Sequence, residues 1–289
     1  MFLRSFAKLN LYLRVCGRRP DNYHDIRTVF ERISIFDTIS IKARRDTRIN
    51  IECNSPLVPS GKDNLAFRAA RILQDKFKAR TGADIKIIKR IPPGAGMGGG
   101  SSNAASVLLG LNRLWNLKLG IECLLKCARL IGSDVAFFIH DCSFAEGRGR
   151  GDNVRPLRAL EGLRLWHVIA VPPLAVRTPL IYRKIDTLKL ALTRPFHDVK
   201  ILSLALEKGN RSLIKQSLYN SLEPVTFKIY PDVGRIKEEF LKAGAEGVLM
   251  SGSGSSVFAL TSGFKESILL ARRLKKEGKS WNVFISHTS

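Results

Sequence analysis

The stretch PPGAGMGGGSSN, residues 92–103, has the composition of a phosphate-binding loop. Its glycines leave backbone N–H groups unobstructed, and the helix predicted to follow adds the positive end of its dipole. The serine hydroxyls could add donors to the same phosphate or help to hold Mg²⁺. We disfavour the alternative, a mobile glycine- and serine-rich linker, because a linker does not normally begin a well-patterned helix. The candidate phosphate-binding residues are Pro92, Gly94, Gly96, Gly98, Gly99, Gly100, Ser101 and Ser102.

Three familiar types of glycine loop differ from this stretch. A Walker A loop needs a lysine that reaches the β and γ phosphates, and Gly100 stands at that position. The dinucleotide-binding pattern is met by Gly94, Gly96 and Gly99, but these glycines follow two prolines and lie roughly ninety residues into the chain. A protein-kinase loop would be followed by H-R-D and D-F-G, and neither occurs. The loop therefore predicts an anion site of another type.

A second glycine- and serine-rich stretch, SGSGSS at 251–256, lies between two predicted strands. Its backbone N–H groups could also face a phosphate of a substrate. A plain hairpin turn explains the same residues equally well when the stretch is taken alone. The candidate residues here are Ser251, Gly252, Ser253 and Gly254.

Periodic patterns in the N-terminal half predict the elements that position the first loop. Alternation predicts a half-buried strand at 9–15 and further strands at 33–41 and 49–53, while apolar residues at 85–88 predict a strand before the loop. A helix is predicted at 64–80, with Asp63 or Asn64 as its N-cap and Gly82 as its stop. Ser101 or Ser102 is expected to open a helix of about four turns. Another helix is expected at 121–131, before Gly132.

The C-terminal half groups its strands and its helices. The segment 132–157 is rich in turn residues and leads to a strand at 165–171. Helices are predicted at 198–208, 211–221, 231–243 and 265–277, and strands at 247–250, 256–261 and 281–286. This grouping predicts an α+β chain. The change in composition within 150–165 places a domain boundary there, which gives domains at 1–155 and 156–289.

Composition limits the class of protein. The 289 residues are 45% hydrophobic and 25% charged, as in an ordinary folded protein, and carry a formal net charge of +23. Such a charge attracts nucleic acid, anionic lipid or phosphorylated substrates, and the scattered basic residues favour a general bias over one nucleic-acid patch. No run approaches the roughly eighteen apolar residues of a membrane span. Five unpatterned cysteines favour buried thiols in a reducing cytoplasm over a metal site.

Several motifs together resemble the GHMP kinases, the family that includes galactokinase, homoserine kinase and mevalonate kinase. They are PPGAGMGGGSSNAA, AKLNLYLRVCGRRPDNYHDIRTVF near the N-terminus, GVLMSGSGSSVFAL near the C-terminus, IGSDVAFFIHDCSFAEGRGRGDNVRPL and NSLEPVTFKIYPDV. The resemblance implies a two-domain fold with a ribosomal-protein-like N-terminal α/β half and a C-terminal α+β half with an antiparallel sheet. It implies ATP as phosphoryl donor, with its phosphates on the first loop, and Mg²⁺.

The resemblance also implies a catalytic pair. Lys8 and Asp134 match the family's lysine and aspartate, so Asp134 would take the proton of the reacting hydroxyl and Lys8 would orient it. Taken alone, Asp134 could equally be the N-cap of a helix and Lys8 a solvated lysine on a strand. The motifs are closest to the branch of the family that phosphorylates the 2-hydroxyl of CDP-methylerythritol, in the non-mevalonate route to isoprenoids.

Substrate-binding residues follow from the same resemblance. Asn10 would contact the substrate from the strand that carries Lys8. Tyr23 and Tyr182 would stack on the two faces of cytosine, while His24 would hydrogen-bond to its edge. Thr178, four residues before Tyr182, belongs to the same segment. Taken alone, a tyrosine or histidine in a basic, turn-rich segment is more often an ordinary surface residue.

Two alternatives remain open at the level of sequence. Another GHMP kinase, of the homoserine or mevalonate class, would share the loop but would not need the cytosine-binding residues. A basic RNA-binding protein would suit the net charge of +23. We expect a monomer or weak homodimer whose partners are ATP and CDP-methylerythritol, with no membrane and no nucleic acid. Asn22, where the family has glycine, departs from the pattern but tolerates the same turn.

Overall fold

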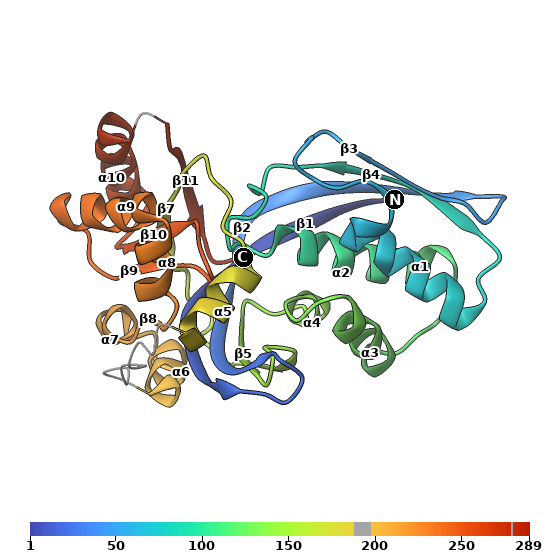
Figure 1. Ribbon diagram of the computed structural model, residues 1–289, viewed down its shortest axis with the longest axis horizontal. Coiled ribbons are helices and arrows are strands. Elements are labelled where there is room, and N and C mark those ends of the chain that lie inside the picture. Colours follow the sequence, from blue (N-terminus) through green and yellow to red (C-terminus); the bar gives the residue numbers. More distant parts are fainter. Residues whose placement is uncertain (188–197, 279) are drawn as a thin grey trace.

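The long alternating stretches form one large mixed sheet (Figure 1). The computed structural model describes residues 1–187, 198–278 and 280–289, and within them seven strands belong to this sheet. β1 pairs antiparallel with β2, which pairs antiparallel with β4 and β5, whereas β3–β4 and β1–β8 are parallel. The strands are β1 (Phe2–Arg18), β2 (His24–Arg44), β3 (Ile49–Cys53), β4 (Gly82–Ile88), β5 (Phe144–Arg148), β6 (Asn153–Pro156) and β8 (Tyr219–Asn220).

Helices of the N-terminal half cover one face of this sheet (Figure 1). Their apolar sides pack on Ile39, Ile41 and Ile85 of the sheet, forming one buried core. The glycine loop leaves β4 and runs directly into α2, which is central among these helices. The elements are η1 (Gly61–Asp63), α1 (Leu65–Phe77), α2 (Gly99–Leu114), α3 (Ile121–Ile131) and α4 (Val135–Ile139).

Elements of the N-terminal half differ from the predictions at three places. Asn64 is the N-cap of α1, as predicted, but Lys78 ends the helix in a left-handed conformation, and Gly82 instead begins β4. α2 begins at Gly99, ahead of both predicted serines, because Gly98 adopts the left-handed N-cap conformation. α4, β5 and β6 lie in the segment predicted only as turn-rich. Short elements of four or five residues leave too little periodicity to recognise.

The prediction of a half-buried β1 was wrong. Leu9 and Leu11 are fully buried, but Lys8 and Asn10 on the other side are only 3% and 2% exposed. A β-bulge between Asn10 and Tyr12 breaks the predicted alternation, so Leu13 packs in a different apolar cluster from Leu9 and Leu11. Alternation also could not show that the side with Lys8 and Asn10 is covered, in this case by the glycine loop and by segments of the C-terminal half.

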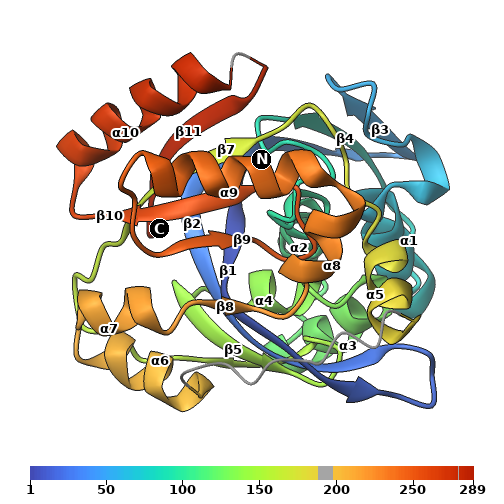
Figure 2. The same cartoon turned by 60° about the vertical axis from the view of Figure 1, so that its left-hand side comes forward.

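A second, smaller sheet forms in the C-terminal half, in the order β11-β7-β10-β9, and all of its pairs are antiparallel as expected. Figure 2 shows α9 and α10 lying on its outer side. Residues from these helices and from the sheet share a buried core that includes Val168, Phe240 and Leu274. The strands are β7 (Trp166–Val171), β9 (Val248–Met250), β10 (Val257–Thr261) and β11 (Asn282–His287).

The helices of the C-terminal half lie between β7 and β11 along the chain. Two of them, α5 and α8, were not predicted; each has a proline as its second residue. α7 ends at Gln216, before the predicted end at 221, and is followed by the short strand β8. The helices are α5 (Thr178–Thr187), α6 (Val199–Glu207), α7 (Arg211–Gln216), α8 (Glu223–Ile229), α9 (Pro231–Lys242) and α10 (Phe264–Glu277).

The two sheets are packed together through buried residues of both. Leu9 and Ile33 of the first sheet and Ile169 and Phe258 of the second belong to one apolar cluster. The α+β class is confirmed. The boundary between domains at 155/156 stays a proposal; β6 ends at Pro156, and the second sheet begins at β7. Among the described helices, none is long and apolar enough to cross a membrane.

Candidate active site

The glycine loop makes a turn that only glycine tolerates at several points. Gly94, Gly96 and Gly98 have φ values of 69°, 75° and 67°, in the left-handed region. A Cβ at Gly96 would lie 2.2 Å from the backbone oxygen of Ser251, so this glycine also permits close contact with the second loop. The left-handed backbone conformation and, at Gly96, the close approach of the second loop therefore both require glycine.

Backbone donors collect where the loop enters α2. The first hydrogen bond of the helix runs from the N–H of Ser102 to the oxygen of Gly98, at 2.9 Å. The N–H groups of Gly99, Gly100 and Ser101 precede that bond and have no partner within the helix. Together with the helix dipole, they form the anion-binding turn that the composition predicts. Pro92 is half-buried at the entrance to the loop.

Ser102, a predicted hydroxyl donor to phosphate, is buried at the base of the loop. The residue is 2% exposed, and its Oγ accepts a hydrogen bond of 2.7 Å from Ser5. Accepting this bond does not use the hydroxyl proton of Ser102, so its phosphate contact stays a prediction. Ser101 is half-buried beside it, and its phosphate contact also stays a prediction.

A buried polar network anchors the base of the loop, and sequence reasoning missed it. Asp37, fully buried on β2, accepts from the backbone N–H groups of Arg90 and Ile91 at 2.7 and 2.9 Å. Lys89 Nζ and Asn103 Nδ2 also donate to Asp37. A buried carboxylate is tolerated only with such pairing. Isolated residues on three elements leave no sequence signal for this arrangement.

The second loop, 251–256, joins β9 to β10 and packs against the first. Ser251 Oγ accepts from the N–H of Asn10 and donates to the oxygen of Gly96, both at 3.1 Å, while Ser256 N–H donates to Ala95. It is thus a hairpin connection that also fixes the first loop. The N–H groups of Ser251, Gly254 and Ser256 are used within the protein. The predicted phosphate contact stays a prediction for Gly252 and Ser253.

Asn220 also holds the second loop, and sequence reasoning missed this contact too. Its Nδ2 donates to the oxygens of Met250 and Gly252, at 2.7 and 2.8 Å. Thr178 Oγ1 lies 2.7 Å from Ser253 Oγ, so the start of α5 is tied to the same loop. The candidate Thr178 therefore lies where the start of α5 contacts the second loop.

Lys8 and Asp134 meet at the point where both loops reach β1. Lys8 Nζ lies 3.2 Å from Asp134 Oδ2, and the lysine side chain is 4% exposed against 33% for the aspartate. Lys8 also donates to Asn10 Oδ1, and its backbone N–H binds the oxygen of Met97 in the glycine loop. Asp134 occupies the N-cap position of α4 but makes no capping hydrogen bond with its side chain.

This geometry leaves the carboxylate of Asp134 able to react. One of its oxygens is oriented by a single buried cation, and the side chain keeps access to solvent. Asn10 is held in turn, because its Nδ2 donates to Thr28 Oγ1 at 2.7 Å. The site therefore combines a proton acceptor, a cation and a turn of backbone donors, which is the set of groups that phosphoryl transfer requires.

The aromatic candidates lie beside this site, on the β1–β2 hairpin and on α5. The rings of His24 and Tyr182 are in contact, with centroids 5.2 Å apart and planes at 35°. Burial, with a smaller contribution from the Asp134 carboxylate, raises the pKa of Tyr182, so its phenol keeps its proton. Tyr23 is 54% exposed, and Arg150 covers one of its faces at 5.0 Å. The structure thus brings His24 and Tyr182 together, and leaves Tyr23 separate from that pair.

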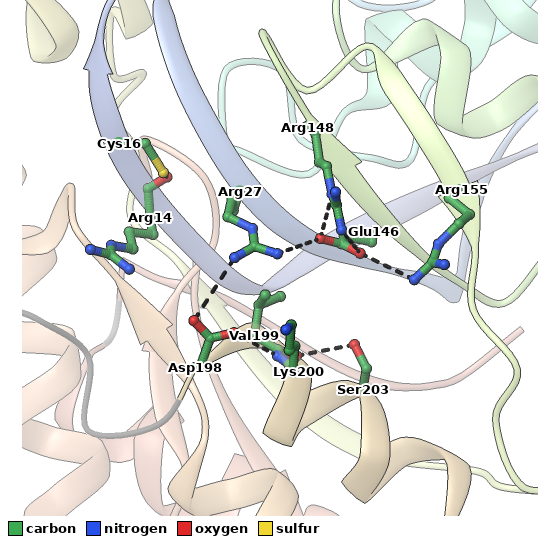
Figure 3. Close-up of polar contacts among 10 residues, drawn as sticks. All are labelled: Arg14, Cys16, Arg27, Glu146, Arg148, Arg155, Asp198, Val199, Lys200 and Ser203. Atoms are coloured by element: carbon green, nitrogen blue, oxygen red, sulfur yellow. Dashed lines mark hydrogen bonds and ion pairs between the residues drawn. The ribbon is translucent and has the colours of Figure 1, made fainter.

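A second charged cluster lies on the opposite side of the same strands (Figure 3). Thr28 faces Asn10, so its neighbour Arg27 points to the other face of β2. There, Arg27, Arg148 and Arg155 surround the carboxylate of Glu146, which is 3% exposed. Arg27 also lies 3.9 Å from Asp198 at the start of α6. We call the side with Lys8 and Asn10 the catalytic face and the side with Glu146 the arginine face.

Comparison with known families shows what the chain resembles. Residues 64–141 match the model described as "GHMP kinases N terminal domain", and residues 202–280 match "GHMP kinases C terminal". A protein of Acetivibrio thermocellus named 4-diphosphocytidyl-2-C-methyl-D-erythritol kinase is 35% identical over 99% of this chain and 98% of its own length. A protein of the same name from Brevibacillus brevis is 41% identical over 89% of this chain and 86% of its own.

A solved structure extends the likeness to three dimensions. A crystal structure of 4-(cytidine 5'-diphospho)-2C-methyl-D-erythritol kinase covers all of both chains, with a TM-score of 0.82 and 33% sequence identity. Its whole length corresponds to this chain, so the likeness extends over both halves of the chain.

Proposed function

The chain belongs to the GHMP kinases, and we propose that it transfers the γ-phosphoryl group of ATP to the 2-hydroxyl of 4-diphosphocytidyl-2-C-methyl-D-erythritol. The products are the 2-phosphate of that alcohol and ADP, and the step belongs to the non-mevalonate route to isoprenoid precursors. The observation that carries the proposal is the contact of 3.2 Å between Lys8 and Asp134, at the junction of the two glycine loops.

The residues around this contact have distinct tasks in the reaction. The N–H groups at the start of α2 bind the phosphates of ATP, where the dipole of α2 favours negative charge. The substrate hydroxyl oxygen forms a bond to the γ-phosphorus while the bond from that phosphorus to the β-phosphate oxygen breaks. The hydroxyl proton passes to Asp134, and ADP leaves. Lys8 keeps the carboxylate in place and would offset charge on the transferring group.

We expect Mg²⁺ at this site to be bound mainly by the phosphate oxygens of ATP. Mg²⁺ commonly uses one or two protein ligands beside phosphate oxygens and waters, and when bound it neutralises charge on the phosphates. Within residues 1–187, 198–278 and 280–289, no three His, Cys, Asp or Glu side chains gather into a metal site. Ser101, half-buried at the start of α2, is the protein group that would help to hold the ion. Ser102, predicted for the same role, accepts from Ser5 through its Oγ.

Recognition of the cytidine end uses the residues on the hairpin and on α5. Tyr182 forms one wall, and Tyr23, whose ring is backed by Arg150, forms the other, while His24 beside Tyr182 hydrogen-bonds to the edge of the base. Stacking on both faces and hydrogen bonds at the edge select a pyrimidine. Asn10 and Thr178 lie between this end and the reacting end, since Asn10 contacts Lys8 and Thr178 contacts the second loop.

Location and assembly are further parts of the proposal. The five cysteines Cys16, Cys53, Cys123, Cys127 and Cys142 are all free thiols, which suits a reducing compartment, and we place the enzyme in the cytoplasm. We propose a monomer or weak homodimer, because the residues assigned to the two substrates all come from one chain.

The test is release of ADP, coupled to an indicator enzyme, with CDP-methylerythritol as substrate and mevalonate and homoserine as controls. We expect turnover with the first compound alone. Turnover with mevalonate or homoserine instead would overturn the proposed substrate but keep the kinase assignment. Absence of ATP turnover with all three alcohols would overturn both.

A further inference from the structure

One face of α5 makes contacts at three successive turns of the helix. Thr178, Tyr182 and Asp186 are four residues apart, so their side chains follow one stripe. Thr178 binds Ser253 of the second loop, Tyr182 packs on the ring of His24, and Asp186 binds the same histidine. α5 therefore joins the loop region to the tip of the β1–β2 hairpin. The function assigned above uses Thr178 and Tyr182 but leaves Asp186 without a task.

The bond between Asp186 and His24 has a definite direction. Asp186 Oδ1 lies 2.8 Å from Nε2 of His24, and His24 is 7% exposed. An ionised carboxylate can only accept, so Nε2 carries the proton and donates it. The second oxygen of Asp186 lies 3.8 Å from Arg18 Nε, so the carboxylate faces a cation as well as the histidine.

This direction fixes the chemistry of the other ring nitrogen. A neutral imidazole that is protonated at Nε2 has a lone pair at Nδ1 and can only accept there. Among the residues that the structure describes, Nδ1 of His24 has no hydrogen-bond partner. Tyr182 lies against the ring and limits its rotation. The ring therefore offers one oriented acceptor beside the proposed pyrimidine site.

We propose that Asp186 is a positioning residue that makes His24 select cytosine over uracil; this inference rests on the proposed function. Cytosine has an amino group at position 4, which donates to an acceptor, whereas uracil has a carbonyl oxygen there. An acceptor fixed at Nδ1 pairs with the amine and repels the carbonyl. A buried polar group left unpaired by the wrong ligand gives stronger discrimination than a difference in shape.

The experiment compares wild type, Asp186→Asn and Asp25→Asn with the cytidine substrate and with its uridine analogue. Asparagine keeps the size of aspartate but can either accept from Nε2 or donate to it, so the tautomer is no longer fixed. Asp25→Asn is the matched control, because it removes one carboxylate from the same hairpin, where Asp25 contacts Arg19 at 2.8 Å. Values of kcat and KM are measured for both alcohols and for ATP.

We expect Asp186→Asn to lower the ratio of kcat/KM for cytidine over uridine by about tenfold, through the KM of the alcohol. The KM of ATP and the kcat should change by less than about twofold, since the phosphate turn is untouched. Asp25→Asn should leave the ratio unchanged. In ¹⁵N spectra of labelled protein, the His24 signals should show the Nε2-protonated tautomer in wild type and a shift toward a mixture in Asp186→Asn.

Two results would overturn the inference. One is an unchanged cytidine-to-uridine ratio in Asp186→Asn, and the other is a wild-type His24 protonated at Nδ1 in the neutral ring. A fall in stability with an unchanged ratio would assign Asp186 a structural role only. If wild type fails to use the cytidine substrate at all, the proposed function itself is wrong, so the two failures are distinguishable.

Discussion

The two faces of β1 and β2 carry charged groups of the same kinds and use them in opposite ways. On the catalytic face, Asp134 has one cation, Lys8, at 3.2 Å, and its side chain is 33% exposed. On the arginine face, Glu146 has three guanidinium groups within 2.9 to 3.4 Å, and its side chain is 4% exposed (Figure 3). A carboxylate with free acceptor capacity can take a proton in a reaction. A carboxylate whose oxygens are already paired with three arginines serves only to hold the strands together.

The electrostatics of the arginine face support this contrast. Burial by itself raises the pKa of Glu146, but the hydrogen bonds from Arg148 and the charges of Arg148, Arg27 and Arg155 outweigh it and lower the pKa. The carboxylate therefore stays ionised at neutral pH and is unsuited to accept a proton. Part of the net charge of +23 is used in this way, to join β2, β5 and β6.

Removing the reactive carboxylate gives the largest expected effect. Asp134→Asn should fold and bind ATP, yet lose roughly 10²-fold to 10⁴-fold in kcat, because the amide cannot accept the hydroxyl proton. Glu146→Gln is the matched variant on the arginine face and should keep kcat within about twofold. Coupled ADP release measures both. Near-normal turnover in Asp134→Asn, or an equal loss in Glu146→Gln, would remove the distinction between the faces.

The second largest effect is expected from disturbing the backbone contact between the two glycine loops on the catalytic face. Gly96→Ala would place a methyl group 2.2 Å from the Ser251 oxygen at a φ of 75°, so the two loops must separate. We expect a loss of about 3 kcal/mol in unfolding free energy, or roughly 6–12 °C in Tm. Gly263→Ala is the control, since its φ is 176° and nothing lies within 4 Å of the added carbon. Calorimetry of both variants provides the measurement, and an unchanged Tm for Gly96→Ala would show that the loops do not need this contact.

Composition and motifs were enough to predict the glycine loops and the pairing of Lys8 with Asp134, but for different reasons. The loop is local, and glycine at positive φ is a property that its composition expresses directly. Lys8 and Asp134 are far apart in the chain, and each alone fitted an ordinary structural role. Only the resemblance of several motifs paired them, and their contact in the structure agrees with that pairing.

Other parts of the site lay beyond what sequence patterns express. Asp37 is a single carboxylate in an otherwise apolar strand, and its partners Lys89 and Asn103 come from two other elements. Periodicity also cannot show which polar face is covered by another part of the chain, so the burial of Lys8 was missed. Tertiary pairing, unlike local conformation, depends on which distant segments meet.

The pH dependence of stability separates the two faces again. The folded-state pKa of Glu146 is lowered, so its stabilising effect is present above the unfolded pKa of about 4.3 and is lost as pH falls below it. Glu146→Gln should cost about 1–3 kcal/mol at pH 7, because three guanidinium groups lose their shared carboxylate. Unfolding in urea at several pH values tests this. The difference between wild type and variant should shrink below pH ~4, and a difference that stays constant would exclude the carboxylate as its source.

The smallest effect is expected at the outer edge of the arginine face. Arg155 is 72% exposed and lies 3.4 Å from Glu146, whereas Arg27 is 28% exposed and also lies near Asp198 of α6. Arg155→Ala should therefore cost less than about 1 kcal/mol, and less still in high salt. Arg27→Ala should cost more, since it breaks contacts between β2, β5 and α6. Urea unfolding at low and high salt measures both. Equal losses of unfolding free energy in the two variants would mean that burial does not determine how much each arginine contributes to stability. A loss of kcat in Arg155→Ala would mean that the arginine face acts on the reaction.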